Sequence, residues 1–180
     1  NPSRDKLAEL LKAFPGQHVR IVSSTRDGSK AIVLVDSDRN PGDYYLFETA
    51  DLKADYLVGR SAWLDPDTMP ARRPIEFKAR DGQRIRGYLT LPPGRDAKRL
   101  PLIVHPHGGP FLTEDNWGFE STPAALASRG YAVLQVNFRG AGGYGHDFVD
   151  AGKRGWATTM IDDIVDGTRW AIEQGHADPA

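Results

Sequence analysis

The chain has 180 residues, of which 39% are hydrophobic and 26% charged, as is usual in soluble globular proteins. Its 23 lysines and arginines nearly balance its 24 aspartates and glutamates, and no dense basic run occurs, which argues against a nucleic-acid surface. No apolar run approaches the roughly 20 residues that a membrane-spanning helix needs. The absence of cysteine excludes disulfides and thiolate metal sites but does not separate a cytoplasmic from a periplasmic location.

The N-terminal segment is predicted to begin with one short amphipathic helix. Residues 3–14 fit such a helix, with Ser3 as its N-cap, Asp5 in its first turn and Pro15-Gly16 as its stop. Its expected apolar face consists of Leu7, Leu10, Leu11 and Phe14.

Short strands separated by turn residues come next. Strands are predicted at residues 19–23, 31–35 and 44–48, and residues 52–58 are compatible with a fourth. The Asp27-Gly28 pair predicts a hairpin turn because both residues tolerate a positive φ, and Asn40-Pro41-Gly42-Asp43 predicts another. This spacing is typical of one blade of a β-propeller, with a free-standing β-meander as the alternative. Since one blade cannot bury both of its faces, the propeller interpretation requires neighbouring blades.

After a linker predicted at residues 65–74, the pattern changes. Residues 75–79 and 85–89 form a predicted hairpin around Asp81-Gly82. The elements expected after it are a buried strand at 102–104, a helix from Thr122-Pro123 to Gly130, a buried strand at 131–136, a helix at 157–174, and at 176–179 the lead-in to another strand. Strands that alternate with helices indicate a parallel sheet. We therefore expect an all-β segment at 1–70 and an α/β domain at 71–180.

The long helix at 157–174 has a predicted apolar face and a C-cap. Gly175 is placed to end the helix as its C-cap residue. The face is expected to consist of Ile161, Ile164, Val165, Thr168, Ala171 and Ile172.

The loop after the strand at 102–104 reads His105-Pro106-His107-Gly108-Gly109-Pro110. Glycines let a backbone approach a substrate closely because they lack Cβ. Backbone N–H groups held ready for a developing negative oxygen stabilise an acyl-transfer transition state by about 3 kcal/mol. Gly109, Gly108 and His107 are therefore the candidate catalytic residues, forming an oxyanion loop. A simple tight turn is the alternative interpretation.

Motifs that occur in a fixed order resemble the catalytic domain of the prolyl oligopeptidase family, especially its acylaminoacyl-peptidase and dipeptidyl-peptidase branches. They are His107-Gly108-Gly109-Pro110, Asn137-Phe138-Arg139-Gly140, Gly142-Gly143-Tyr144-Gly145, and the helix with Asp162-Asp163 and Trp170. The resemblance implies a partial α/β-hydrolase domain preceded by a propeller whose last blade is formed by residues 17–60. It also implies that the Gly109 N–H is an oxyanion donor. His107, where some relatives have a tyrosine, is expected to shape the loop.

The nucleophile that this family requires is not found in the sequence. It lies in Gly-x-Ser-x-Gly at a strand-to-helix elbow, with the acid and the histidine later in the chain. No such motif occurs, and the serines present are Ser3, Ser23, Ser24, Ser29, Ser37, Ser61, Ser121 and Ser128. We therefore expect a fragment of a serine peptidase that is inactive alone. A carboxylesterase and a non-catalytic binding module are the alternatives.

The expected partners follow from the same interpretation. They are a peptide substrate and either the remainder of the catalytic domain or a second copy of the chain. Such a partner would cover the sheet edge and the apolar faces that a severed domain exposes. Without it, we expect the chain to be poorly soluble.

The glycine-rich segment and the histidines also match patterns for cofactors. Residues 140–145 fit the dinucleotide motif Gly-x-Gly-x-x-Gly, but Gly152 and Gly155 interrupt the long helix that a dinucleotide fold requires. The residues His105, His107, His146 and Asp147 suggest zinc, but Pro106 restricts the backbone and no carboxylate follows at a metallohydrolase spacing. No cofactor and no metal are predicted.

Charged residues near the predicted site are interpreted structurally. Asp162-Asp163 is expected to place favourable charge near a helix N-terminus, on a solvated face. Arg139 follows a buried strand, at the edge of the sheet where α/β enzymes bind ligands. We expect it to hold the glycine-rich loop by hydrogen bonds rather than to touch the substrate.

Overall fold

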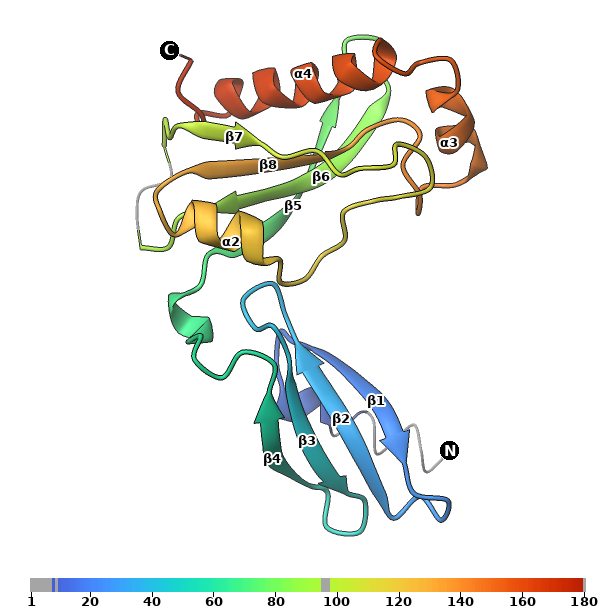
Figure 1. Cartoon of the computed structure of the whole chain (residues 1–180), viewed down its shortest axis with the longest axis vertical. Helices are drawn as coiled ribbons and strands as arrows, with labels where there is room; N and C mark the ends of the chain where they lie inside the picture. The colour runs from blue at the N-terminus through green and yellow to red at the C-terminus, as the bar shows by residue number, and fades with distance from the viewer. Residues whose placement is uncertain (1–7, 9, 95–97, 180) are drawn as a thin grey trace. The chain divides into compact units, whose positions relative to one another are not determined.

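A computed structural model describes residues 8, 10–94 and 98–179. These residues form two compact units (Figure 1). The first contains the described residues up to Met69 together with Gly118–Glu120, and the second contains Pro70–Trp117 and the described residues from Ser121 onward. Each unit has its own four-stranded sheet and its own hydrophobic core.

The first unit is an antiparallel sheet in the order β1-β2-β3-β4. Its strands are β1 (His18–Ser24), β2 (Lys30–Asp36), β3 (Asp43–Glu48) and β4 (Lys53–Gly59), so all of the predicted strands are confirmed. The first hairpin turns at Gly28, whose φ is +70°, as an Asp-Gly turn requires. Asp27 Oδ1 accepts the Ser29 N–H at 3.1 Å and braces this turn.

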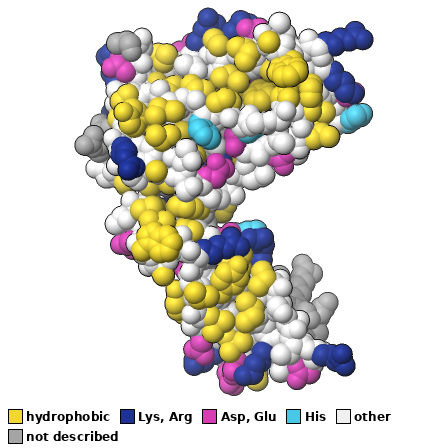
Figure 2. Space-filling view, viewed as in Figure 1, with side chains coloured by type: hydrophobic (Ala, Val, Ile, Leu, Met, Phe, Trp, Pro, Cys, Tyr) yellow, Lys and Arg dark blue, Asp and Glu magenta, His cyan; other side chains and the backbone are white. Residues whose placement is uncertain are grey.

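Alternation along β2 produces the core of the first unit. Ala31, Val33 and Val35 are buried on one face, where they pack with Val19, Phe47 and Leu10. Residues 10–13 are helical, whereas Ser3, Asp5 and Leu7 of the predicted helix lie outside the described residues. Leu11 is 48% exposed, so its predicted place on the apolar face is wrong. Figure 2 shows hydrophobic side chains gathered on the visible surface of both units.

The second unit is a mixed sheet in the order β5-β6-β8-β7. Its strands are β5 (Ala71–Lys78), β6 (Arg84–Leu91), β7 (Leu102–Val104) and β8 (Ala132–Asn137). The predicted hairpin is confirmed as β5 and β6, and the one parallel pair among these four strands is β7 with β8. The linker ends earlier than predicted, because β5 begins at Ala71 after the short 3₁₀ helix η1 (Pro66–Thr68).

The helices of the second unit are α2 (Ser121–Ala127), α3 (His146–Gly152) and α4 (Thr159–Glu173). Figure 1 shows α2 and α4 on opposite sides of the sheet. Every residue of β8 is buried, which explains its almost continuous apolar sequence. β7 is only half-buried because it lies at the edge of the sheet, so the predicted burial of this strand is wrong.

The buried face of α4 differs from the predicted one. Ile161 is 50% exposed and Val165 is 36% exposed. Of the predicted face, Ala171 is buried, and Ile164 and Ile172 are partly buried against the core. The buried residues that were not predicted are Met160, Asp163, Asp166 and Gly167. The difference arises because arginines from other elements pair with the two carboxylates, and because Gly167 allows close packing. A Cβ on Gly167 would lie 2.9 Å from the Phe77 ring.

After α4 the chain returns to the segment that leads into β7. The Leu100 N–H donates to the His176 carbonyl at 2.9 Å, and the Asp178 N–H donates to the Leu100 carbonyl at 2.9 Å. These bonds form a parallel bridge between Leu100 and Ala177. Residues 176–178 thus run beside the start of β7 in the same direction, as the predicted strand lead-in requires.

Candidate active-site loop

The loop that follows β7 is held in a conformation that depends on glycine. Gly109 has a φ of +130°, and its peptide bond to Pro110 is cis. The Thr113 hydroxyl donates to the Gly108 carbonyl at 2.6 Å. A Cβ on Gly109 would lie 2.1 Å from Thr113 Oγ1, whereas a Cβ on Gly108 would meet no atom within 4 Å. Only Gly109 is therefore sterically required to be glycine, a distinction that the sequence did not show.

His107 packs against the strand end that supports the loop. Its ring stacks on the Phe138 ring, with centroids 4.4 Å apart and an interplanar angle of 13°. Its Nδ1 lies 2.8 Å from the Gly108 carbonyl, which can only accept a hydrogen bond, so this contact requires the tautomer with the hydrogen on Nδ1. A neutral ring with the proton on Nδ1 has no N–H at Nε2 to offer an oxyanion. These contacts support a loop-shaping role for His107.

The backbone donors of the loop are available to a ligand. Gly108 and Gly109 are both exposed. Within the described part of the chain, their N–H groups donate to no other atom. Free N–H groups on a fixed loop are the type of donor that stabilises a negative oxygen.

A cavity of about 310 Å³ opens beside these donors. Trp156, on the segment between α3 and α4, contributes to its lining although the residue is 74% exposed. The other lining residues are Pro106, His107, Gly108, Gly109, Pro110, Phe138, Met160, Ile161 and Ile164. The lining is mostly apolar, as is typical of small-molecule sites.

The second half of the loop is fastened to β8 and to the glycine-rich segment that follows it. The Leu112 N–H donates to the Gly140 carbonyl at 3.0 Å, and the Gly142 N–H donates to the Thr113 carbonyl at 3.1 Å. The Asn137 side chain accepts from the Asp115 N–H at 2.8 Å and donates to the Asp115 carbonyl at 2.9 Å. Asn137, a polar residue in a buried strand, was a sequence signal for this attachment.

The first three residues of the glycine-rich segment at 140–145 use their backbone donors inside the protein. The N–H groups of Gly140, Ala141 and Gly142 all donate to carbonyls of the chain. α3 ends at Gly152, where an added Cβ would lie 2.6 Å from the Gly140 Cα. The helix that follows, α3, has seven residues, whereas a dinucleotide fold has a long helix at this place.

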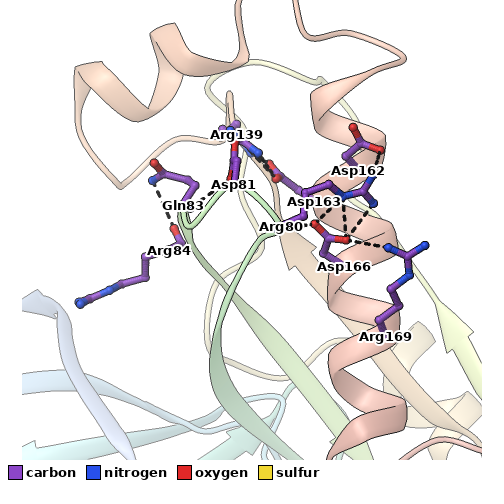
Figure 3. A network of polar contacts seen from close by, with 9 residues as sticks. All are labelled: Arg80, Asp81, Gln83, Arg84, Arg139, Asp162, Asp163, Asp166 and Arg169. Atoms are coloured by element: carbon purple, nitrogen blue, oxygen red, sulfur yellow. Dashed lines mark hydrogen bonds and ion pairs between the residues drawn. The ribbon is translucent and has the colours of Figure 1, made fainter.

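Arg139 is bound to two carboxylates (Figure 3). Asp163 accepts hydrogen bonds from the Arg139 backbone N–H at 2.9 Å, from Nε at 3.0 Å and from Nη2 at 2.6 Å. Arg139 Nη1 also donates to Asp81. These carboxylates, Asp163 foremost, raise the pKa of the Arg139 guanidinium above its ordinary range. The Arg139 side chain thus binds carboxylates instead of the glycine-rich loop.

Asp163 is completely buried, so its predicted place on a solvated face is wrong. Its burial is possible because the Arg139 guanidinium compensates its charge. Asp162, next to it on α4, is partly exposed and lies 2.8 Å from Arg80 Nη1.

Asp166 repeats this arrangement one turn further along α4. It accepts the Arg80 backbone N–H at 2.8 Å and Arg80 Nη2 at 2.8 Å. Figure 3 shows Arg80 between Asp162 and Asp166. The hydrogen bonds from Arg80 hold the pKa of the Asp166 carboxyl below its usual value.

The remaining sequence patterns do not converge on another site. His146 begins α3, where its Nε2 lies 3.7 Å from Asp150. Among the described residues, no cluster of three or more His, Asp or Glu side chains could hold a metal ion. In the same residues, no helix is both long and apolar enough to cross a membrane.

Comparison with known proteins places these features in a family. The sequence model of the prolyl oligopeptidase family matches residues 117–180. Dipeptidyl aminopeptidase BIII of Pseudoxanthomonas mexicana is 35% identical over 93% of the chain and 25% of its own length. Dipeptidyl peptidase family member 6 of Caenorhabditis elegans is 32% identical over 96% of the chain and 26% of its own length.

The chain belongs to the prolyl oligopeptidase family. Its fold is similar to that of the acylaminoacyl peptidase of Pyrococcus horikoshii, with a TM-score of 0.66 and 24% identity over 88% of the chain and 25% of that structure. The second unit has part of an α/β-hydrolase fold, and the first resembles a propeller blade. The chain spans about a quarter of the length of the curated relatives it matches.

Proposed function

We propose that the protein containing this chain is a serine peptidase that hydrolyses peptide bonds of short peptides through an acyl-enzyme. The observation that carries the proposal is the Gly109 N–H, which is exposed and has no partner among the described residues. It lies in a backbone conformation that only glycine can adopt beside Thr113. Such a donor stabilises the oxyanion of a tetrahedral intermediate.

The strand lead-in at residues 176–178 supports a position for the nucleophile. A strand that continued from it would run along the free edge of β7 and end near the loop at 107–110. In α/β-hydrolases the serine lies on the elbow after such a strand. A serine there would have the Gly109 N–H beside it, and the N–H after the serine would be the second donor.

The reaction then follows from these groups. The serine hydroxyl attacks the peptide carbonyl while a histidine of the parent protein takes its proton. The negative oxygen accepts hydrogen bonds from the Gly109 N–H and from the second donor. The histidine returns the proton to the leaving amine, and water hydrolyses the acyl-enzyme. Because this chain supplies the loop without the triad, we propose that it is inactive alone.

The substrate class is supported by the first unit and by the relatives. We assign residues 1–70 to the last blade of a propeller and residues 71–180 to the catalytic domain. A propeller that covers the active site would admit only small peptides. Relatives named as dipeptidyl peptidases support peptides cleaved near one end.

The test compares Gly109→Ala with Gly108→Ala in the full-length protein. A serine-directed fluorophosphonate should label the protein, and a dipeptidyl p-nitroanilide should be hydrolysed. Gly109→Ala should lower kcat by about 100- to 1000-fold, because the side chain displaces the donor. Gly108→Ala is the matched control, because it fits the loop and should retain activity.

Other results would contradict the proposal. A protein that the fluorophosphonate does not label would be a non-catalytic binding module. A labelled protein that cleaves p-nitrophenyl esters but no peptide substrate would be a carboxylesterase. Equal effects of the two alanine substitutions would remove Gly109 from the oxyanion site.

A further inference from the structure

We propose that Asp163 is a positioning residue for the oxyanion loop, because its carboxylate fixes the backbone at the end of β8 on which the loop rests. This inference rests on the proposed function and extends it to a residue on α4. Asp163 lies on α4, outside the loop at 107–110, and does not line the cavity. It would act through the backbone of Arg139.

The first step is the contact between Asp163 and a backbone N–H. β8 ends at Asn137, so the Arg139 N–H is outside the strand ladder. Asp163 Oδ2 accepts this N–H at 2.9 Å, in a place where both residues are buried. Without this acceptor, a buried donor would be left unsatisfied, which costs about 1–3 kcal/mol. The backbone would then move to find another partner.

The second step is the support that the neighbours of Arg139 give to the loop. Phe138 precedes it, and its ring stacks on the His107 ring. Gly140 follows it, and its carbonyl accepts the Leu112 N–H at 3.0 Å. A shift of Arg139 therefore reaches the oxyanion loop from both sides of Gly108 and Gly109.

The guanidinium of Arg139 makes a buried carboxylate possible at this place. It donates to Asp163 through Nε and Nη2, and through Nη1 to Asp81. The charge of Asp163 is thus neutralised locally, while its Oδ2 still accepts the backbone N–H. Asparagine at this position would retain one acceptor oxygen but turn its NH₂ group toward other donors.

Asp166 provides a matched comparison on the same helix. It accepts a backbone N–H and a guanidinium from Arg80, as Asp163 does from Arg139. Arg80, however, lies in the β5–β6 turn, next to Asp81. Among the described residues, its side-chain hydrogen bonds and ion pairs are with Asp162 and Asp166. The two aspartates therefore have the same chemistry, but only Asp163 accepts the backbone N–H between Phe138 and Gly140, the residues that contact the loop.

The experiment compares kcat and KM of the Asp163→Asn and Asp166→Asn variants of the full-length enzyme with those of the wild type. Hydrolysis of a dipeptidyl p-nitroanilide is normalised to the serines labelled at saturation by a fluorophosphonate, so that unfolded molecules are not counted. Asp163→Asn should lower kcat per labelled serine by about 10- to 100-fold with little change in KM, because a misplaced donor affects only the transition state. Asp166→Asn should lower the thermal midpoint but leave kcat per labelled serine near the wild-type value.

The outcomes separate this inference from the proposed function. If the wild-type enzyme is neither labelled nor active, the proposed function fails and the inference fails with it. If the wild type is active but Asp163→Asn retains its kcat, or both variants lose kcat equally, only the inference is overturned. If Asp163→Asn does not fold, Phe138→Leu tests the second step by removing the ring that supports His107. An unchanged kcat in that variant would also overturn the proposal.

Discussion

The second unit has an ion pair that is buried on both sides, whereas the pairs between the strands of the first unit have an exposed partner. In the first unit, Lys30 and Glu48 pair at 2.8 Å with both side chains substantially exposed. In the second unit, Asp163 is completely buried and its partner Arg139 nearly so. Exposed pairs contribute little to stability because water screens them. A buried pair is different, because the loss of one partner leaves a charge without compensation in the core.

The two sheets are therefore stabilised by different interactions. The first unit depends on apolar alternation along β2, and its charges lie at the margin. The second unit has an apolar core as well, but α4 brings two carboxylates against the sheet and its hairpin turn. Each carboxylate requires a particular arginine. Substitutions in the buried pair of the second unit should therefore have large effects, whereas substitutions in the exposed pairs of the first unit should have small ones.

The largest effect is expected for Asp163→Ala. It should lower the free energy of unfolding of the second unit by about 3–5 kcal/mol, because Arg139 would lose its buried partner. Urea-induced unfolding in a Trp63→Phe background, where the remaining tryptophans report on the second unit, would measure it. The double variant Asp163→Leu, Arg139→Met is the control and should lose less. A double variant as unstable as Asp163→Ala would contradict this explanation.

A smaller, pH-dependent effect is expected for Asp166→Asn. Arg80 lowers the pKa of the Asp166 carboxyl in the folded state, so the charged form stabilises the fold. This contribution is fully present above the unfolded pKa of about 3.9 and is lost as the pH falls through the lower folded pKa. The variant should be less stable than the wild type at neutral pH, and the difference should shrink as the solution is acidified.

Urea midpoints of both proteins between about pH 7 and pH 2.5 would measure this convergence. Asp162→Asn, which removes a partly exposed carboxylate from the same helix, is the control and should have a smaller effect. A difference between Asp166→Asn and the wild type that stays constant over the whole range would show that the carboxylate charge is not responsible.

The smallest effect is expected in the first unit. Arg20 Nη2 pairs with Asp36 Oδ2 at 2.8 Å, but the Arg20 side chain is 49% exposed. Arg20→Met should therefore lower the free energy of unfolding of the first unit by only about 0.2–1 kcal/mol. The rate of hydrogen exchange at the β2 amides would measure this loss of stability. The exchange rate at the β8 amides, which should not change, is the reference. A loss as large as that of Asp163→Ala would remove the distinction between the units.

Sequence patterns predicted the parts of the fold that depend on local periodicity. Alternation in β2 and the apolar run of β8 were sufficient to locate both strands. The glycines at 108 and 109 were sufficient to locate the candidate loop. Its hydrogen-bond partner Thr113 was missed, because a threonine four residues later carries no distinctive signal.

The buried face of α4 could not be predicted in the same way. An aspartate in an amphipathic helix normally lies toward solvent, and Asp163 and Asp166 were interpreted by that rule or left unassigned. Their burial depends on arginines that are 24 and 86 residues away in the chain. Periodicity contains no information about partners at that distance. The wrong placement of Ile161 and Val165 on the buried face is a direct consequence.

The long separation between Arg80 and Asp166 also bears on how the protein is made. A ribosome adds about 5–20 residues per second, so Asp166 is synthesised on the order of 4–17 seconds after Arg80. During that interval the β5–β6 hairpin has left the ribosome before its α4 partner exists, and the arginine remains hydrated. The core of the second unit can close only when α4 arrives. The nascent hairpin is therefore a segment that a chaperone would meet with its apolar side uncovered.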